Sequence, residues 1–452
     1  MPSPDTTSLA ASAVQPRDLS VSSADDPPAS VNRLWVTALG LAGMIIAVIL
    51  LPRGTRPEVA ILFILALTAL PMLAVDIAVF KVHRRSTTGL DWTRAPDFSL
   101  ERSATKLVGL LAVYIAIGFV YWVLQEYRSD YYKVYFNFVR LIWPYVAIVT
   151  LAYVPLVDAY MVQPRDGYWQ AGRALLGGFR DADRKVLAQY VLGWAVKGFF
   201  LPYILPNIMG DIYFISDSPF SKGASGFSPF YDFAYNFLYT IDVVFASLGY
   251  LMTLRVSDSH IRSTDPTTLG WLVTLICYRP FGDLLYDLLP YEASTPYFGT
   301  WLRADHPVLY WIFGSTTLVC LTIYAASSML FGYRFSNLTH RGILTNGPYR
   351  LTKHPQYLFK NISWWLIAVP FASAGGTEAA VRACLMLAAY NFIYFMRART
   401  EERHLSRDPT YVAYALWINE HGILAWLGRL IPFLRYKPPV QATNELQGRR
   451  LA

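Results

Sequence analysis

The sequence has few charged residues and few cysteines for its length. Of its 452 residues only 15% are charged, and three are cysteines. A chain with so little charge lacks the polar surface of ordinary soluble domains. Cys277, Cys320 and Cys384 all lie in apolar runs, where a free thiol behaves as a small apolar side chain. We therefore expect neither a disulfide framework nor a metal site, and the sequence has no glycine-rich phosphate-binding loop.

Apolar residues, in contrast, are abundant and come in long runs. They make up 54% of the chain, and aromatic residues make up 15%. A helix needs about twenty apolar residues to cross roughly 30 Å of hydrocarbon, whereas soluble helices of that length need a polar face. The sequence predicts an all-α fold, a polytopic transmembrane helical bundle of about ten spans, at residues 34–51, 59–80, 107–124, 141–161, 186–208, 230–254, 269–289, 308–331, 362–374 and 379–396.

Two of these spans are atypical. The run 269–289 contains Arg279, Pro280, Asp283 and Asp287, which is compatible with a re-entrant segment. The run 362–374 is short for a full crossing and is compatible with a helix that stops below the far surface.

The basic residues predict the orientation of the chain. Lys and Arg gather in the connections 81–106 and 162–185, and short basic connections stay in the cytoplasm. With ten spans, both termini are then cytoplasmic. The net charge of +8 is explained by this orientation, so no nucleic-acid partner is expected. We predict an integral protein of the cell inner (plasma) membrane, surrounded by membrane lipids.

The polar residues best suited to chemistry follow the eighth span. Residues 333–356 form a cytoplasmic connection that contains Asn346-Gly347-Pro348 and ends at His354-Pro355. Because proline restricts the residue before it to extended conformations, His354 is expected at a bend rather than inside a helix. An ordinary turn beside an aromatic interfacial belt would have the same composition.

A second group of polar residues follows the last span. The spacings of four, three, four and three residues place Tyr390, Tyr394, Arg397, Glu401 and His404 on one helical face. The alternative is a solvated helix end with local ion pairs such as Arg399 with Glu402. A helical hairpin would bring the two groups to the same side of the membrane, where they could form one pocket.

At these residues the sequence resembles the isoprenylcysteine carboxyl methyltransferase family and its phospholipid methyltransferase relatives. The matching elements are Gly347-Pro348-Tyr349, Lys353-His354-Pro355-Gln356-Tyr357, Arg399-Thr400-Glu401-Glu402, Leu405 and Tyr411-Val412-Ala413-Tyr414. Family members carry Arg before the His-Pro and Gly two residues after the motif tyrosine, where this chain has Lys353 and Phe359.

The resemblance implies an enzyme that transfers a methyl group from S-adenosyl-L-methionine to a lipidic or isoprenoid-type acceptor at the membrane–cytoplasm boundary. Glu401 or Glu402 would meet the cofactor, and Arg397 or Arg399 would act in catalysis by facing the lipophilic methyl acceptor. The remaining cofactor site would be lined by Arg341, Gly342, Ile343, Leu344, Tyr349, His354, Pro355, Gln356 and Tyr357.

Two other functions are compatible with the same chain. NADPH-dependent sterol-type membrane reductases end in a similar His-Pro-x-Tyr segment, but they carry an acidic residue on the next turn, where this chain has Lys360 and Asn361. A non-catalytic lipid transporter or lipid-binding protein is suggested by charged residues inside the spans, which face a cavity unless they pair between helices. These residues are Asp76, Asp158, Lys197, Asp242, Arg279, Asp283 and Asp287.

The sequence therefore divides into four parts. Residues 1–32 are polar and poor in aromatics, so a disordered cytoplasmic tail is expected. Residues 33–300 form an N-terminal transmembrane helical layer whose role the resemblance does not explain. Residues 301–437 form the methyltransferase-like membrane domain, and residues 438–452 form a flexible tail.

Overall fold

The computed structural model describes residues 26–293, 295, 297–373 and 375–439. The predicted disorder of residues 1–25 and the predicted flexible tail after residue 439 lie outside the described residues. Within them the fold is all-α, as predicted. The helices of the N-terminal part are α1 (Leu34–Leu50), α2 (Pro57–Ala78), α3 (Leu100–Val123), α4 (Lys133–Tyr160), α5 (Gly167–Gly177), α6 (Arg184–Ile204), α7 (Asn207–Asp217), α8 (Phe227–Leu251), α9 (Thr268–Leu275) and α10 (Phe281–Leu288).

The C-terminal part continues with further helices. A short antiparallel strand pair, β1 (Ser263–Thr264) with β2 (Thr339–His340), ties the two parts together. The C-terminal helices are α11 (Phe298–Asp305), α12 (Pro307–Leu330), α13 (Pro355–Ala368), α14 (Gly376–Leu405), α15 (Pro409–His421) and α16 (Ala425–Leu430).

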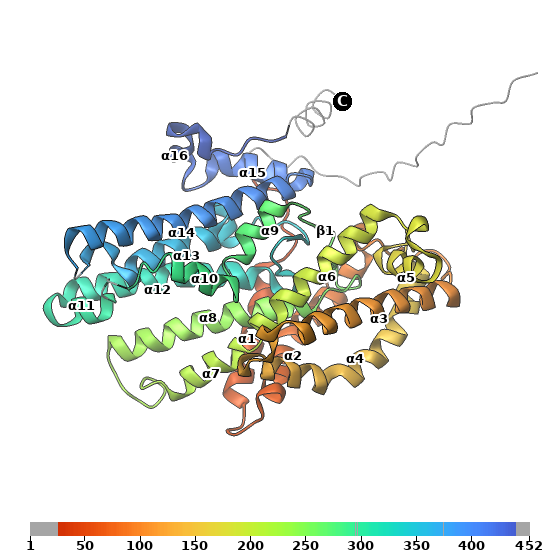
Figure 1. Cartoon of the computed structure of the whole chain (residues 1–452), viewed down its shortest axis with the longest axis horizontal. Coiled ribbons are helices and arrows are strands. Elements are labelled where there is room, and N and C mark those ends of the chain that lie inside the picture. Colours follow the sequence, from red (N-terminus) through yellow and green to blue (C-terminus); the bar gives the residue numbers. More distant parts are fainter. Residues whose placement is uncertain (1–25, 294, 296, 374, 440–452) are drawn as a thin grey trace, which may run out of the picture.

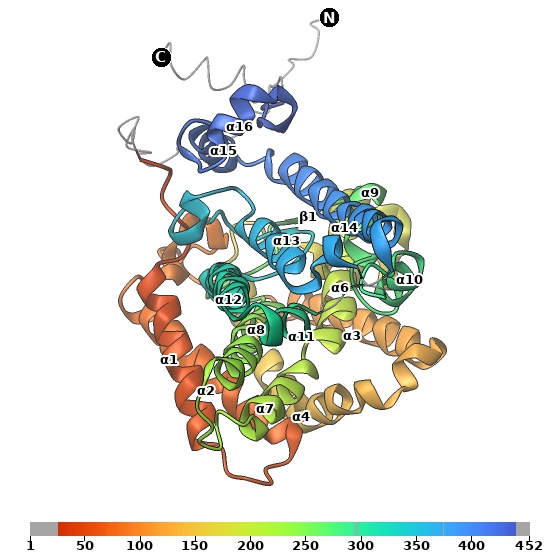
Figure 2. The ribbon, with the colours of Figure 1, turned by 90° about the vertical axis from the view of Figure 1, so that its left-hand side faces the viewer.

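The long helices run in three adjoining groups, which are α12 to α14, α3 to α6, and α1 with α2 (Figure 1). Helices α12, α13 and α14 pack against one another on one side, and α3, α4, α5 and α6 pack together on the other. Helix α8 contacts both α12 and α6 and so joins these groups. The end-on view shows α1 and α2 beside α12, with α15 and α16 beyond α14 at one edge (Figure 2).

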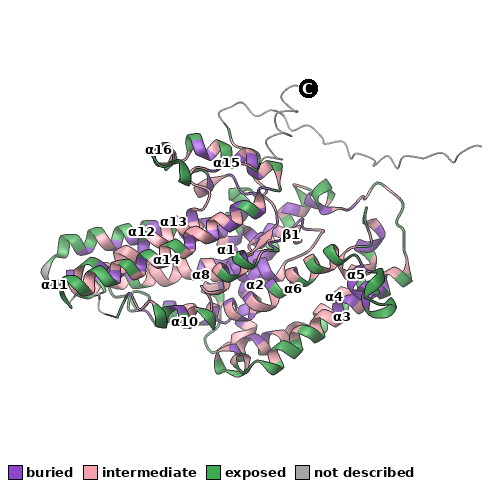
Figure 3. Ribbon diagram, turned by 45° about the horizontal axis from the view of Figure 1, so that its top comes forward, coloured by how far each residue is buried: buried purple, intermediate pink, exposed green. Residues whose placement is uncertain are grey.

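Among the described residues, six helical segments are long and apolar enough to cross a membrane, and they include α2, α3, α12 and α14. Large apolar side chains stay exposed on their outer faces, for example Ile115 and Phe119 on α3 and Ile148 on α4 (Figure 3). Such a surface suits lipid rather than water. The chain is therefore an integral membrane protein, although the count of ten spans and the cytoplasmic orientation stay predictions.

Both atypical spans are short helices in the structure. The run 269–289 divides near Arg279 and Pro280 into α9 and α10, each of eight residues. At 1.5 Å per residue neither helix can cross roughly 30 Å of hydrocarbon. The run 362–374 falls in α13, which has 14 residues and ends before Val369.

Residues 28–32, at the end of the predicted N-terminal tail, contact the C-terminal part of the chain. The Asn32 amide donates to the carbonyls of Leu330 and Phe331 at 2.9 and 2.6 Å, and the Thr345 hydroxyl donates to the carbonyl of Pro28. Residues 28–32 are ordered because they satisfy the free carbonyls at the C-terminal end of α12. They therefore lie on the same side of the molecule as the motif region.

Two close backbone approaches set the helix spacing. A Cβ atom at Gly43 on α1 would lie 2.0 Å from the carbonyl oxygen of Leu67 on α2. A Cβ atom at Gly249 on α8 would lie 2.1 Å from the carbonyl oxygen of Phe335, just after α12. Glycine allows both contacts, and the second one holds the segment after α12 against α8.

Several charged residues of the spans pair between elements. Asp158 forms an ion pair with Lys106 at 2.7 Å and accepts a hydrogen bond from Arg102 at 2.6 Å. Asp76 accepts a hydrogen bond from the Tyr333 hydroxyl and lies 3.8 Å from Arg334. Lys197 has different partners, because its ammonium donates to the Thr253 hydroxyl and lies over the Trp194 ring.

The Asp158 pair predicts a large effect on stability. Lys106 is 4% exposed, so Asp158→Ala leaves a buried ammonium without its nearest carboxylate. Breaking a buried ion pair costs about 3 to 5 kcal/mol, which should appear in the unfolding free energy of the detergent-purified protein. Asp130→Ala removes a pair with Lys133 in which both side chains are exposed, and it should change stability by less than about 1 kcal/mol. Equal effects of the two variants would contradict this account.

Candidate functional site

The site begins at the predicted bend before α13. His354 has φ −130° and ψ 63°, and Pro355 opens the helix, so the expectation that His354 lies outside a regular helix is confirmed. The first turn of α13 then directs Tyr357 toward the C-terminal half of α14, whereas the Gln356 amide donates to the Ser328 hydroxyl of α12 at 2.6 Å. The Tyr357 hydroxyl donates to Glu401 Oε2 at 3.0 Å.

The two motif glutamates on α14 have different surroundings. The Glu402 side chain is 7% exposed and lies 2.5 Å from Lys353 Nζ, 3.0 Å from Arg399 Nη1 and 3.4 Å from His354 Nε2. The Glu401 side chain is 39% exposed, and apart from Tyr357 its nearest polar partner is His354 Nδ1 at 3.6 Å. Glu402 is therefore fully paired inside the protein, whereas the Glu401 carboxylate can still accept hydrogen bonds from a ligand.

The two arginines of this helix also differ. Arg397 is 3% exposed and pairs with no carboxylate among the described residues. Its guanidinium instead donates to Asn337 Oδ1 at 3.2 Å and to the Tyr278 hydroxyl at 3.4 Å. Arg399 points the other way, pairs with Glu402 and lies over the Phe433 ring.

The predicted stretch 341–344 lies in the scaffold around the site. The buried Arg341 guanidinium donates to the carbonyls of Gly249, Met252, Ser259, Tyr333 and Phe335. Burial, together with the nearby charge of Arg334, lowers the pKa of Arg341 to about 9, so the side chain stays protonated at neutral pH.

The residues that follow Arg341 pack rather than line a pocket. Gly342 has φ +112° and abuts Val31. Ile343, Leu344 and Tyr349 belong to a buried cluster with Tyr414 of α15.

The strand pair is anchored beside the end of α14. His340 Nε2 of β2 lies 3.1 Å from Asp408 Oδ2. Burial opposes ionisation of Asp408, but hydrogen bonds from His340 and from the Thr410 backbone outweigh it and hold the pKa of this carboxyl below its ordinary value. This contact fixes β2, and with it Thr339, against the C-terminal end of α14.

A narrow pocket lies between β2, α13 and the end of α14. Gln356, Tyr357, Arg397 and Glu401 line it, together with Asp265, Asn337, Thr339 and His404. In the described part of the chain the buried Thr339 Oγ1 and His404 Nδ1 have no hydrogen-bond partner. Buried polar atoms without partners indicate that a ligand supplies them.

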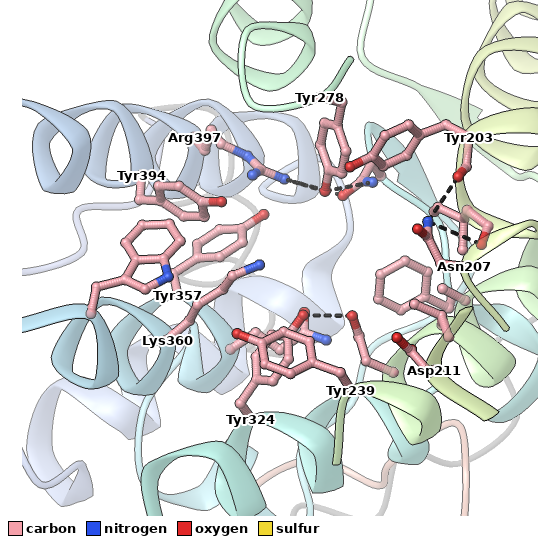
Figure 4. Close-up of a pocket in the computed structure, with 18 of the residues that line it drawn as sticks. Tyr203, Asn207, Asp211, Tyr239, Tyr278, Tyr324, Tyr357, Lys360, Tyr394 and Arg397 are labelled. Carbon is pink, nitrogen blue, oxygen red and sulfur yellow. Dashed lines mark hydrogen bonds between the residues drawn. The ribbon is translucent and has the colours of Figure 1, made fainter. Parts of the chain in front are cut away.

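A wide cavity adjoins the narrow pocket. It has a volume of about 460 Å³, and its wall includes Lys360, Arg397, Asp211 and Asp242 (Figure 4). Phe335, Asn337, Gln356, Tyr357 and Arg397 line both spaces, so a single wall separates them. The cavity is also lined by seven tyrosines: Tyr203, Tyr235, Tyr239, Tyr278, Tyr324, Tyr357 and Tyr394.

The structure thus brings together only part of the predicted site. Gln356, Tyr357, Glu401 and Arg397 line the two spaces, whereas Arg341, Gly342, Ile343, Leu344, Tyr349, His354, Pro355, Arg399 and Glu402 support them from outside. Helix periodicity had already placed Tyr394, Arg397, Glu401 and His404 on one face, and this is confirmed.

Other lining residues were missed by the sequence analysis. Asn337 and Asp265 come from loops without a motif, and Tyr239 comes from a span that shows only an apolar pattern. No local signal marks them, because long-range packing alone brings them to the site.

The described fold and site define an integral membrane protein with a polar pocket between α13 and α14, and one comparison with known families bears on its chemistry. Residues 308–407, which hold α12, α13 and α14, match the model of the isoprenylcysteine carboxyl methyltransferase (ICMT) family. The match confirms the resemblance of the C-terminal region and supports a membrane methyltransferase of the isoprenylcysteine type. It covers less than a quarter of the chain. Neither the curated proteins nor the solved structures contain a match.

Proposed function

We propose that the protein transfers a methyl group from S-adenosyl-L-methionine to a lipophilic acceptor at the membrane–cytoplasm boundary. The narrow pocket would hold the reactive end of the cofactor, and the wide cavity would hold the acceptor. The observation that carries this proposal is the wall shared by the two spaces, which gives Tyr357 and Arg397 access to both. Methyl transfer needs in-line positioning of two molecules more than acid or base chemistry.

The lining of the narrow pocket suits the cofactor chemically. When bound, S-adenosylmethionine supplies an electrophilic methyl group on a sulfonium cation. Glu401 offers a carboxylate to the sulfonium, to an ammonium or to ribose hydroxyls, and Tyr357 adds an aromatic ring to the lining beside it. The partnerless Thr339 hydroxyl and His404 ring nitrogen add hydrogen-bonding capacity at the same place.

The surroundings of Glu402, the second glutamate of the motif, indicate a structural role. Glu402 holds Lys353, His354 and Arg399 together, and this fixes the bend that presents Gln356 and Tyr357. Glu402 would therefore position the site, and Glu401 would contact the cofactor.

A binding experiment separates these two roles. Glu401→Gln should weaken S-adenosylmethionine binding by about ten- to a hundredfold, because a hydrogen bond to a charged group contributes about 1.5 to 3 kcal/mol. Glu402→Gln should chiefly lower thermal stability. Isothermal titration of the cofactor into the detergent-purified protein, with NADPH as the rival ligand, measures the affinity, and a melting curve of each variant measures its thermal stability.

The outcomes of this titration are distinct. Unchanged cofactor affinity in Glu401→Gln would remove the assignment of the narrow pocket. Binding of NADPH in place of S-adenosylmethionine would replace methyl transfer by the reductase function.

A further inference from the structure

The wide cavity contains two charged groups that the protein leaves without partners. The Lys360 ammonium of α13 lies 5.2 Å from the ring centre of Tyr324 and 5.6 Å from that of Trp364, and no carboxylate or carbonyl among the described residues pairs with it. Asp211 of α7 accepts no hydrogen bond from the described residues, and its buried Oδ2 atom is partnerless.

The other charged side chains of the cavity already form hydrogen bonds with protein groups. The Tyr324 hydroxyl donates to Asp242 Oδ2 at 2.5 Å, and the Ser328 hydroxyl donates to Asp242 Oδ1. Arg397 donates to Asn337 and Tyr278. Asp242 therefore offers little to a ligand, and the open positions are Lys360 and Asp211.

These two groups face the cavity from opposite sides (Figure 4). Lys360 belongs to the part of the chain that matches the methyltransferase family, whereas Asp211 belongs to the N-terminal helices that the match does not cover. An unpaired charge at membrane depth costs several kcal/mol unless a partner neutralises it. A ligand with only one charge would leave the other group unpaired.

A second opening adjoins the same cavity. It has a volume of about 380 Å³, shares Tyr203 and Asn207 with the cavity, and is bordered by Tyr286 of α10 and Tyr390 of α14. Beside it, Leu284 and Leu288 of α10 expose apolar side chains. The cavity therefore continues past Arg279 and Asp283, which also line the opening, toward these exposed apolar side chains of α10.

We propose that the wide cavity binds an amphiphile with a zwitterionic head group, its acidic group at Lys360 and its ammonium at Asp211. The head group occupies the cavity, whose volume is in the range of small-molecule sites, and the apolar chain extends through the opening beside α10. The N-terminal helices thereby set the acceptor specificity of the C-terminal domain. This inference rests on the proposed function for the identity of the ligand as methyl acceptor.

Four amphiphiles with the same chain test the proposal: N-dodecylglycine, dodecanoate, dodecylamine and dodecanol. Their affinities for the full chain are measured by ligand-induced shifts of the melting temperature in one detergent, at about pH 8, where carboxylates are ionised and amines protonated. The common chain keeps the apolar part of the four ligands the same, and the partition of each ligand into the micelles is measured so that affinities are compared at equal free concentration. The zwitterionic N-dodecylglycine should bind about tenfold more tightly than any of the others, as one added charge-assisted hydrogen bond would give.

Two variants assign the charges. Lys360→Met should make N-dodecylglycine bind no better than dodecylamine, and Asp211→Asn should make it bind no better than dodecanoate. Lys197→Met is the matched control for the first, because Lys197 also lies over a tryptophan but lines neither the cavity nor its opening. Asp217→Asn is the control for the second, because Asp217 is exposed on the same helix α7. Both controls should keep the ranking of the unaltered protein.

The inference is overturned if dodecanol binds as tightly as N-dodecylglycine, or if Lys360→Met and Asp211→Asn keep the original ranking. The ranking on the unaltered protein decides the first point even if a variant fails to fold. Titration of S-adenosylmethionine into the unaltered protein is run in parallel. If S-adenosylmethionine does not bind, the proposed function is refuted. If S-adenosylmethionine binds but N-dodecylglycine binds no more tightly than the other three ligands, only the zwitterionic acceptor is refuted.

Discussion

Arg341→Met is expected to abolish accumulation of the folded protein. Arg341 is 3% exposed, and its guanidinium satisfies the carbonyls of five residues from α8 and from the segments after α8 and α12. Hydrogen bonds to a charged group contribute about 1.5 to 3 kcal/mol each, so the loss of several approaches the whole stability of a domain, about 5 to 15 kcal/mol. Size-exclusion chromatography of a fluorescently tagged protein measures the folded fraction.

The control for this variant is Arg350→Met. Arg350 lies in the same connection, is half exposed and pairs with the exposed Asp26, so its loss should leave the folded fraction unchanged. If Arg341→Met instead gives a stable protein that has lost only cofactor binding, then Arg341 acts in the cofactor site, as the family resemblance implies.

The sequence predicts the class of fold because lipid imposes a simple rule. A helix that crosses the bilayer must be apolar along about twenty residues, and α2, α3 and α12 are visible as such runs. The same rule identifies 269–289 as an atypical span, because charged residues and Pro280 interrupt its apolar run. The order of residues 28–32 is not visible, because it depends on Asn32 reaching carbonyls about 300 residues further along the chain.

The candidate site is predictable only where it is local. Helix periodicity places Tyr394, Arg397 and Glu401 on one face, since the spacing of α14 alone decides this. Asp211 reaches the wide cavity because α7 packs on α8 and α8 packs on α12, and a single sequence contains no trace of that packing. The family resemblance predicts that Arg341 and Glu402 contact the cofactor. In the structure both side chains instead bind protein groups outside the pocket and support its walls.

Arg397→Met is expected to lower the rate of methyl transfer by about a hundredfold or more. Arg397 is a buried cation between the two spaces, held by Asn337 and Tyr278 and surrounded by the rings of Tyr357 and Tyr394. Its Nε–H has no partner among the described residues, so it can donate to an acceptor group held against the shared wall. Removing one such preorganised donor lowers kcat by about 10² to 10³ in other enzymes.

Arg399→Met provides the matched control, because it changes the same residue type two positions away on the same helix. Arg399 lines neither space, and its side chain is 36% exposed beside Glu402 and Phe433. Its loss should reduce transfer by no more than about threefold, since a partly exposed ion pair contributes less than about 1 kcal/mol. The assay follows tritiated methyl from S-adenosylmethionine into an extract of the host membrane lipids, with cofactor affinity measured separately. Equal losses in the two variants would show that the helix end responds to charge in general, and transfer that survives in Arg397→Met would place the acceptor away from the shared wall.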